Sequence, residues 1–334
     1  MKRLFLFLNI LASICTCGAF AENNDKEEAV VDALRVVVIG SGGKEGEERS
    51  LYEEALKKMF VRIKEINPDA VFYTGSLIFG LESKASPENL NIFRQRLHSF
   101  SQLTERYLGD EIPVYPVMGN HHLVSPEAVQ LFREHFHIHN RAPLEPYQLD
   151  YPVFLDQVQF IVLATGIHER QYRGYRRYVQ TMPLLDWLEK ELRTGSEWIR
   201  YRIVVGHEPA FSPFHPAADR KGMGRDPLRR DLFWTILQEN HVLAYFCSNG
   251  VMFDRSNRHG VWQIITGGAG IPESIQKEDF FFQHYILLTI PKNQEESPLV
   301  QVYDLTGKKW DEFSLAPSDR PVHQLRISGA VWKK

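Results

Sequence analysis

Residues 113–122 read PVYPVMGNHH, a short apolar run that ends in glycine, asparagine and two histidines. The apolar residues predict a strand over 112–117, and the polar residues that follow predict a loop at its carboxyl end. In layered α/β proteins, the loops at the carboxyl ends of strands carry the reactive groups. This stretch therefore predicts an α/β protein with its site at a strand end.

The rest of the chain alternates short apolar runs with helical spacing. Strand-like runs at 35–39 and 70–74 enclose a helical pattern over 51–66, the order expected when strands feed helices. A serine followed by proline and an acid predicts helix starts at Ser86 and Ser125. Further strands are expected over 160–164, 203–205, 242–246, 261–266, 285–290, 299–303 and 310–313, and further helices over 183–192 and 228–237. With no internal repeat, one α/β domain is predicted.

Four stretches end alike, with small or polar residues after an apolar run. They are DAVFYTGSLIFG (69–80), PVYPVMGNHH (113–122), IVVGHEPAFSP (203–213) and YFCSNGVMFDRSNRHGVWQIITGGAG (245–270). In this order they resemble the calcineurin-like metallophosphoesterase family, which includes the purple acid phosphatases, from about Leu34 to Leu315. The resemblance implies a four-layer α/β/β/α sandwich, with two mixed β-sheets face to face and helices outside.

The activity implied by the resemblance is metal-dependent hydrolysis of phosphoric esters. That chemistry needs oxygen and imidazole ligands around two metal ions, with a carboxylate bridging them. Here Ser41 and Gly43 stand at the family's Asp-x-His positions, Ser76 at its bridging aspartate and Val251 at one of its histidines. These four ligand positions are therefore lost.

Three of the family's positions are retained. Asn120 and His207 match metal ligands, and His121 matches the histidine that contacts the substrate phosphate or protonates the leaving group. Asn249 offers a weak carbonyl oxygen in place of a histidine. One histidine and two neutral amides do not offset the charge of a divalent cation, so we expect no metal cofactor; the alternative is one weakly bound manganese, zinc or iron ion. A structural alternative is that His121 and His207 serve only as hydrogen-bonding residues in a core cleft.

Two basic segments lie on loops that, by the resemblance, border the cleft. The first carries Arg173, Arg176 and Arg177 among tyrosines, and the second carries Arg225. Arginine forks beside aromatic faces suit phosphates and glycans. These arginines are therefore a candidate anion-binding rim; the alternative is that both segments are solvated loops whose arginines are balanced by nearby acids.

The two ends of the chain carry processing and linker signals. Residues 1–21 read as a signal peptide, with two basic residues, an apolar run and a small-x-small cleavage site. The apolar run is shorter than the roughly 20 residues that a membrane span needs. We therefore expect export to a periplasm or the medium, with no stable membrane span after cleavage. An acidic leader is expected over 22–33, the phosphoesterase domain over 34–316 and a polar tail over 317–334.

The composition narrows the choice of partner. The 334 residues carry a formal net charge of −3, which does not favour nucleic acid, so no nucleic-acid partner is expected. Cys247, the one cysteine after the signal peptide, lies in an apolar run, which predicts a buried residue and not a nucleophile. The sequence thus predicts an exported, non-catalytic pseudo-phosphoesterase that binds an anionic small molecule, a glycan or a protein partner. The alternative is an atypical phosphoesterase that hydrolyses phosphate esters with one weakly bound metal.

Overall fold

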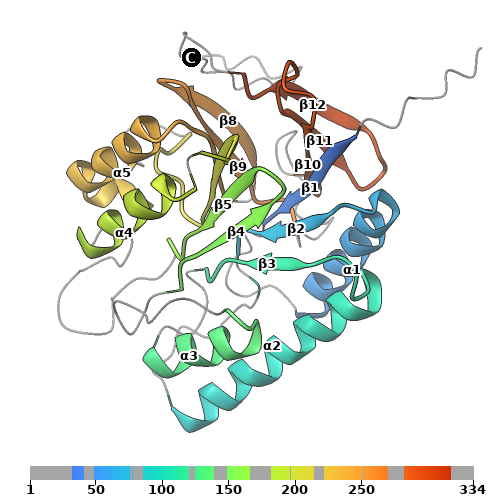
Figure 1. Ribbon diagram of the computed structural model, residues 1–334. Coiled ribbons are helices and arrows are strands. Elements are labelled where there is room, and N and C mark those ends of the chain that lie inside the picture. The colour runs from blue at the N-terminus through green and yellow to red at the C-terminus, as the bar shows by residue number, and fades with distance from the viewer. Residues whose placement is uncertain are drawn as a thin grey trace, which may run out of the picture. The chain divides into compact units, whose positions relative to one another are not determined.

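The computed structural model describes residues 32–40, 49–75, 77, 86–119, 125–138, 149–165, 182–195, 197–213, 222–250, 252–269 and 282–316. These residues form two six-stranded sheets with helices on their outer faces (Figure 1). Both sheets contain parallel and antiparallel pairs, so both are mixed. The predicted sandwich of two mixed sheets flanked by helices is confirmed.

The first sheet joins the beginning of the described chain to its end. Its strand order is β12-β11-β10-β1-β2-β3. The strands are β1 (Ala33–Ile39), β2 (Ala70–Tyr73), β3 (Val114–Pro116), β10 (His284–Pro291), β11 (Leu299–Asp304) and β12 (Lys309–Ser314). β1 pairs in parallel with β2, with Val36 opposite Ala70, and antiparallel with β10, with Val38 opposite Ile286. Because β1 has a neighbour on each side, its continuous apolar run suits a strand buried on both faces.

The second sheet is built around four parallel strands. Its order is β4-β5-β6-β7-β9-β8, and β4 and β8 are the antiparallel edges. The strands are β4 (Tyr151–Leu155), β5 (Val158–Val162), β6 (Tyr201–Val205), β7 (Val242–Cys247), β8 (Phe253–Arg258) and β9 (Val261–Thr266). The two edge strands are additional to those expected from the sequence.

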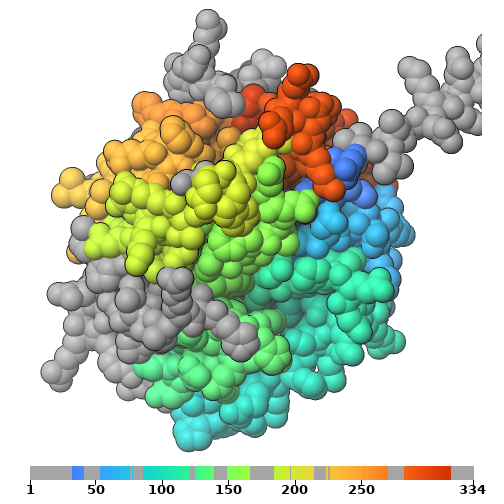
Figure 2. Space-filling view, in the orientation of Figure 1, coloured from blue at the N-terminus to red at the C-terminus, as the bar shows by residue number. Residues whose placement is uncertain are grey.

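Five α-helices are described, and two of them begin directly after the predicted capping serines, Ser86 and Ser125. They are α1 (Arg49–Ile66), α2 (Pro87–Tyr107), α3 (Pro126–His135), α4 (Met182–Arg193) and α5 (Pro227–Glu239), with the short 3-10 helix η3 (Gly222–Arg225) before α5. The Ser86 hydroxyl accepts a hydrogen bond from the Asn89 N–H at 3.1 Å, and Ser125 caps α3 in the same way at 3.1 Å. Helices α2 and α3 pack together and form a continuous surface at the bottom of Figure 2.

The two sheets face each other across an apolar core. The Phe72 ring on β2 stacks on the Phe160 ring on β5, with centroids 4.5 Å apart and an interplanar angle of 24°. Both rings are fully buried, and this contact joins the inner faces of the two sheets. Within the described part of the chain, no helix combines the length and the apolar character needed to cross a membrane.

Candidate site at the strand ends

The carboxyl ends of strands from both sheets meet at one place. Gly40 follows β1, Thr74 follows β2, Ser248 follows β7 and Thr266 ends β9. A Cβ placed on Gly40 would overlap the Thr74 hydroxyl and the Thr266 carbonyl oxygen, and would lie 2.8 Å from the Ser248 Cβ. Glycine is therefore required at position 40, because the two sheets close on each other here.

His207 connects the second sheet to the first. It follows β6 and is fully buried. Its Nδ1 lies 2.8 Å from the carbonyl oxygen of Thr74, in the loop after β2. Because a carbonyl oxygen only accepts hydrogen bonds, we assign a proton to Nδ1; in the neutral form of the ring the lone pair is then on Nε2.

Ser248 brings a second donor to the same carbonyl group. Its hydroxyl oxygen lies 2.9 Å from the Thr74 oxygen and 3.1 Å from the Gly75 oxygen, and its proton is donated to one of them. The same hydroxyl lies 3.0 Å from Nδ1 of His207. Ser248 is fully buried, so these hydrogen bonds are shielded from water. These hydrogen bonds join an imidazole, a hydroxyl and two carbonyl groups, and no carboxylate takes part in them.

Thr165 holds the loop that carries His207. Its hydroxyl accepts hydrogen bonds from the backbone N–H groups of His207, at 2.6 Å, and Glu208, at 2.7 Å. The Tyr245 hydroxyl donates to the Glu208 carbonyl oxygen at 2.6 Å, and complete burial raises the pKa of Tyr245 well above its ordinary value. The loop is thus fixed by neutral donors and acceptors. We call Thr74, Gly75, Thr165, His207 and Ser248 the cleft floor, after the cleft that the resemblance implies here; all five residues are buried.

A buried carboxyl group lies beside the cleft floor. Asp150 precedes β4, and its Oδ1 accepts a hydrogen bond of 2.8 Å from the N–H of Ala164, the neighbour of Thr165. Its Oδ2 has no hydrogen-bond partner among the described residues. Burial raises the pKa of Asp150 to about 7, although the Ala164 hydrogen bond opposes the shift. A carboxylate at this position is costly, and a protonated acid is tolerated.

The described residues do not fit the two-metal centre that the fold implies. No three or more of their His, Cys, Asp and Glu side chains are grouped to hold a metal ion. The cleft floor offers one imidazole, hydroxyl groups and backbone carbonyls, whereas a two-metal site for phosphate chemistry needs carboxylates as well. A metal ion bound here would use Nε2 of His207, because Nδ1 is bonded to Thr74.

The structure describes two of the predicted site residues in full, His207 and Asn249. His207 lies in the cleft floor, as a strand-end residue should. Asn249 follows β7, is half-buried and has a φ of 56°, in the left-handed region that asparagine tolerates. Arg225 ends η3, but its side chain lies outside the described part. The other predicted site residues also lie outside it: Ser41, Gly43, Ser76, Asn120, His121, Arg173, Arg176, Arg177 and Val251.

Two arginines that follow Arg225 are paired with acids. Arg229 Nε lies 3.5 Å from an Asp226 carboxylate oxygen, and Arg230 Nε lies 2.8 Å from one of Asp231. The Asp226 carboxylate also caps α5. Both arginines lie on α5 and not in a loop, and the Arg230 guanidinium packs over the Phe211 ring at 4.8 Å.

Sequence reasoning missed two residues that hold His207, Thr74 through its carbonyl oxygen and Thr165 through its hydroxyl. Thr74 and Thr165 each follow a buried strand within three residues, so the strand-end rule that found His207 also applies to them. Cys247 is buried, as predicted, and burial raises the pKa of its thiol.

Comparison with known proteins supports the fold. No protein-family model matches the chain, and no curated protein is similar to it in sequence. A purple acid phosphatase from yellow lupin (Lupinus luteus) seeds has a similar structure, with a TM-score of 0.58 at 14% identity, covering 85% of this chain and 53% of that chain. The chain thus spans about half the length of the lupin phosphatase.

Two further structures are similar over nearly their whole length. A dimetal phosphatase from Danio rerio has a TM-score of 0.58 at 11% identity, covering 86% of this chain and all of that chain. GAP50, the anchor in the inner membrane complex of Plasmodium, has a TM-score of 0.54 at 15% identity, covering 86% of this chain and 90% of that chain. The chain has the fold of the calcineurin-like metallophosphoesterases. Similarity at this level of identity establishes the fold alone.

Proposed function

We propose that this chain is a non-catalytic pseudo-phosphoesterase, a binding protein built on a phosphatase fold. The main support is the cleft floor, where His207 Nδ1 and the Ser248 hydroxyl both lie within hydrogen-bond distance of the Thr74 carbonyl oxygen. In a two-metal enzyme, the strand ends supply carboxylate and imidazole ligands that stabilise the ions. Here neutral groups satisfy one another, so the floor is stable without an ion.

The residue types at the strand ends support the same proposal. Serine at positions 41 and 76 leaves the family's metal-ligand and bridging aspartate positions without a carboxylate. Without the bridge no pair of ions is held, and no metal-bound hydroxide is generated as a nucleophile. The fold also occurs in a protein described as an anchor, so it is compatible with a structural role.

The ligand that we propose for the cleft is an anionic small molecule, a glycan or a protein partner. The rim arginines Arg173, Arg176, Arg177 and Arg225 would bind it, because guanidinium forks pair with phosphate and carboxylate groups. Pyrophosphate is a suitable probe. We expect it to raise the melting temperature of the protein, and the triple change R173Q/R176Q/R177Q to abolish that rise. Arg193→Gln on α4, where Arg193 pairs with Glu189, is the matched control.

The decisive experiment measures metal content and turnover on the same preparation. The purified protein is incubated with manganese, zinc or iron, desalted, and assayed with p-nitrophenyl phosphate. We expect substoichiometric metal and no hydrolysis. About two metals per chain, with turnover abolished by His207→Ala, would mean that residues outside the described part complete a working site.

A second candidate function follows from the tautomer of His207. With Nδ1 bonded to Thr74, Nε2 carries the lone pair that a single ion would need. Asn120 and Asn249 would complete the site of an atypical phosphoesterase with one weakly bound metal. One metal per chain, with hydrolysis lost on chelation and in the His207→Ala variant, would favour this enzyme over the pseudo-phosphoesterase.

We also propose that the chain is exported and cleaved before Glu22. The support is the arrangement of basic, apolar and small residues over 1–21. Expression of the whole chain in a secreting host, followed by mass measurement, tests this proposal. A mature product that starts at Glu22 is expected, and an intact chain that remains with the cells would contradict it.

A further inference from the structure

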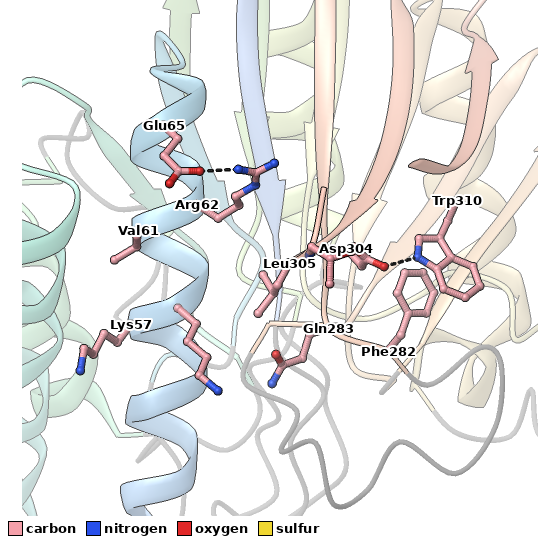
Figure 3. A pocket seen from close by; sticks show the side chains of 11 residues that line it. Lys57, Val61, Arg62, Glu65, Phe282, Gln283, Asp304, Leu305 and Trp310 are labelled. Atoms are coloured by element: carbon pink, nitrogen blue, oxygen red, sulfur yellow. Dashed lines mark hydrogen bonds and ion pairs between the residues drawn. The ribbon is translucent and has the colours of Figure 1, made fainter. Parts of the chain in front are cut away.

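A second concave region lies between helix α1 and the hairpin of β11 and β12. It is a cavity of about 530 Å³ (Figure 3), within the range of small-molecule sites. One wall is the side of α1, and the other is the hairpin together with the residues before β10. None of the described residues of the cleft floor lines it. The pocket is therefore separate from the site at the strand ends.

The helix wall is basic with an apolar residue in its middle. Lys58 and Arg62 are four residues apart and lie on one face of α1, next to Val61. The Arg62 guanidinium pairs with Glu65 (Figure 3). It also lies against the hairpin turn, because a Cβ on Gly307, whose φ is +86°, would overlap it. Contacts with helix and hairpin thus hold Arg62 in place at the mouth of the pocket.

The hairpin wall is organised by the carboxylate of Asp304. Its Oδ1 accepts hydrogen bonds from Thr306 N at 2.8 Å, Thr306 Oγ1 at 2.6 Å and Lys308 N at 3.1 Å, and its Oδ2 accepts one from Trp310 Nε1 at 2.8 Å. Partial burial opposes the shift, but these hydrogen bonds lower the pKa of Asp304. Four donors therefore stabilise the charged form of this carboxylate.

Aromatic packing completes the hairpin wall. The Trp310 ring stacks on the Phe282 ring, with centroids 4.6 Å apart and an interplanar angle of 29°. Lys308 Nζ lies 3.8 Å from the centroid of the Trp310 ring. Leu305 lies between this aromatic pair and α1 in Figure 3. The wall is preformed and presents apolar edges to the pocket.

The charges of the two walls indicate the chemistry of the ligand. Three cationic side chains line the pocket, Lys57, Lys58 and Arg62, against two carboxylates, Glu65 and Asp304. Glu65 pairs with Arg62, Asp304 is held by the hairpin donors, and Lys57 also pairs with Glu54 at 3.4 Å. Counted together, the lining side chains carry three positive and two negative formal charges, so an approaching anion meets one net positive charge beside an apolar surface.

We propose that this pocket binds a small molecule with one anionic group on a compact apolar body. The anionic group lies at Lys58 and Arg62. The apolar body packs against Val61, Leu305 and Phe282. This site is independent of the proposed function of the cleft, because no described residue of the cleft floor takes part.

The test is a fluorescence titration of the purified protein with 8-anilinonaphthalene-1-sulfonate, an anionic group on an aromatic body. N-phenyl-1-naphthylamine, the same body without the sulfonate, is the neutral comparison. We expect saturable one-to-one binding of the sulfonate, binding at least about tenfold weaker for the neutral compound, and a loss of about tenfold in Lys58→Glu. Equal affinity for the two compounds, or no saturable binding, would overturn the proposal.

Two further variants locate the bound probe. Lys64→Glu makes the same charge change on α1, but Lys64 faces Gly109 after α2, 3.3 Å from where a Cβ of that glycine would lie. The affinity of the Lys64→Glu variant for the sulfonate probe is expected to stay within about twofold of wild type, since charges separated by a Debye length are screened. Trp310→Phe keeps an aromatic wall but removes an energy donor, so quenching of tryptophan emission by the probe should fall. Equal losses in the two lysine variants, or unchanged quenching, would place the probe elsewhere and refute the site.

Discussion

The cleft floor and the α1–hairpin pocket differ in how far their polar and charged side chains are exposed to water. In the cleft floor, His207 and Ser248 are fully buried, and the hydrogen bonds join neutral groups. In the pocket, charged side chains remain partly exposed, as in the Arg62–Glu65 pair, where 37% and 56% of the side-chain surfaces are exposed. Isolated charges are expensive where water is excluded and inexpensive where water reaches them. Carboxylates at strand ends are thus tolerable beside metal ions, and serine is the better residue without them.

The largest effect is expected from Asp150, a buried carboxyl group beside the floor. The folded pKa of Asp150, about 7, exceeds its ordinary value of 3.8, so the unfolded chain loses this proton first. The protonated Asp150 side chain stabilises the folded protein relative to the unfolded chain. This contribution to the free energy of unfolding is fully present below about pH 4 and is lost as the pH rises to about 7. Three pKa units correspond to about 4 kcal/mol.

Asp150→Asn should remove that part of the pH dependence. Urea unfolding at several pH values between 4 and 8 measures how the free energy of unfolding depends on pH. The variant's free energy of unfolding should fall less than that of wild type over this range. Asp110→Asn, at an exposed position, controls for the loss of one acid. If the free energy of unfolding changes with pH in the same way in wild type and Asp150→Asn, Asp150 is not the source of this pH dependence.

Removing the histidine of the cleft floor should have the next largest effect. His207→Ala deletes a buried ring and its hydrogen bond to Thr74, which we expect to cost about 3 kcal/mol of unfolding free energy. Equilibrium urea unfolding measures this loss in the free energy of unfolding. The control is His98→Ala, at an exposed position on α2. A loss no greater than that of the control would mean that the floor does not depend on this bond.

The hydroxyl of Ser248 should contribute less, because Thr74 keeps the His207 donor when it is removed. Ser248→Ala is expected to cost about 1 kcal/mol, the usual net value of a buried hydrogen bond. The same unfolding assay applies, with Ser99→Ala on α2 for comparison. A gain in stability would indicate that the hydroxyl is strained in the network and not bonded within it.

The smallest effect on stability is expected in the pocket. Lys58→Glu reverses a charge at an exposed position and should change the free energy of unfolding by less than about 0.5 kcal/mol. The comparison of the two regions predicts this separation: floor variants alter stability, and the Lys58 variant alters ligand binding. A loss of 2 kcal/mol or more in Lys58→Glu would break the distinction.

Local signals in the sequence predicted the helix starts and the positions of strand ends. Ser86 and Ser125 cap their helices because their partners lie three residues away along the chain. The position of His207 after a buried strand likewise follows from local pattern. The missed strand β8, FDRSNR, is rich in polar residues yet mostly buried, because it pairs with β9 in the second sheet. Its pairing, and not its own pattern, makes it a strand.

The sequence could not predict which residues form hydrogen bonds with the site residues. Thr74 and His207 are 133 positions apart, and their contact depends on how two sheets close on each other. The pocket is likewise formed by α1 and a hairpin more than two hundred residues later, through the contact of Arg62 with Gly307. Neither pairing leaves a periodic signal, since each rests on one long-range contact.

The central place of β1 in its sheet bears on the order in which the chain is made. β1 is the first described strand, yet one of its two neighbours, β10, begins at His284. Until that part of the chain has been synthesised, one edge of β1 has no β10 to pair with. Such non-local pairing delays folding until late in synthesis. The first sheet can therefore be completed only after the chain has been synthesised beyond His284.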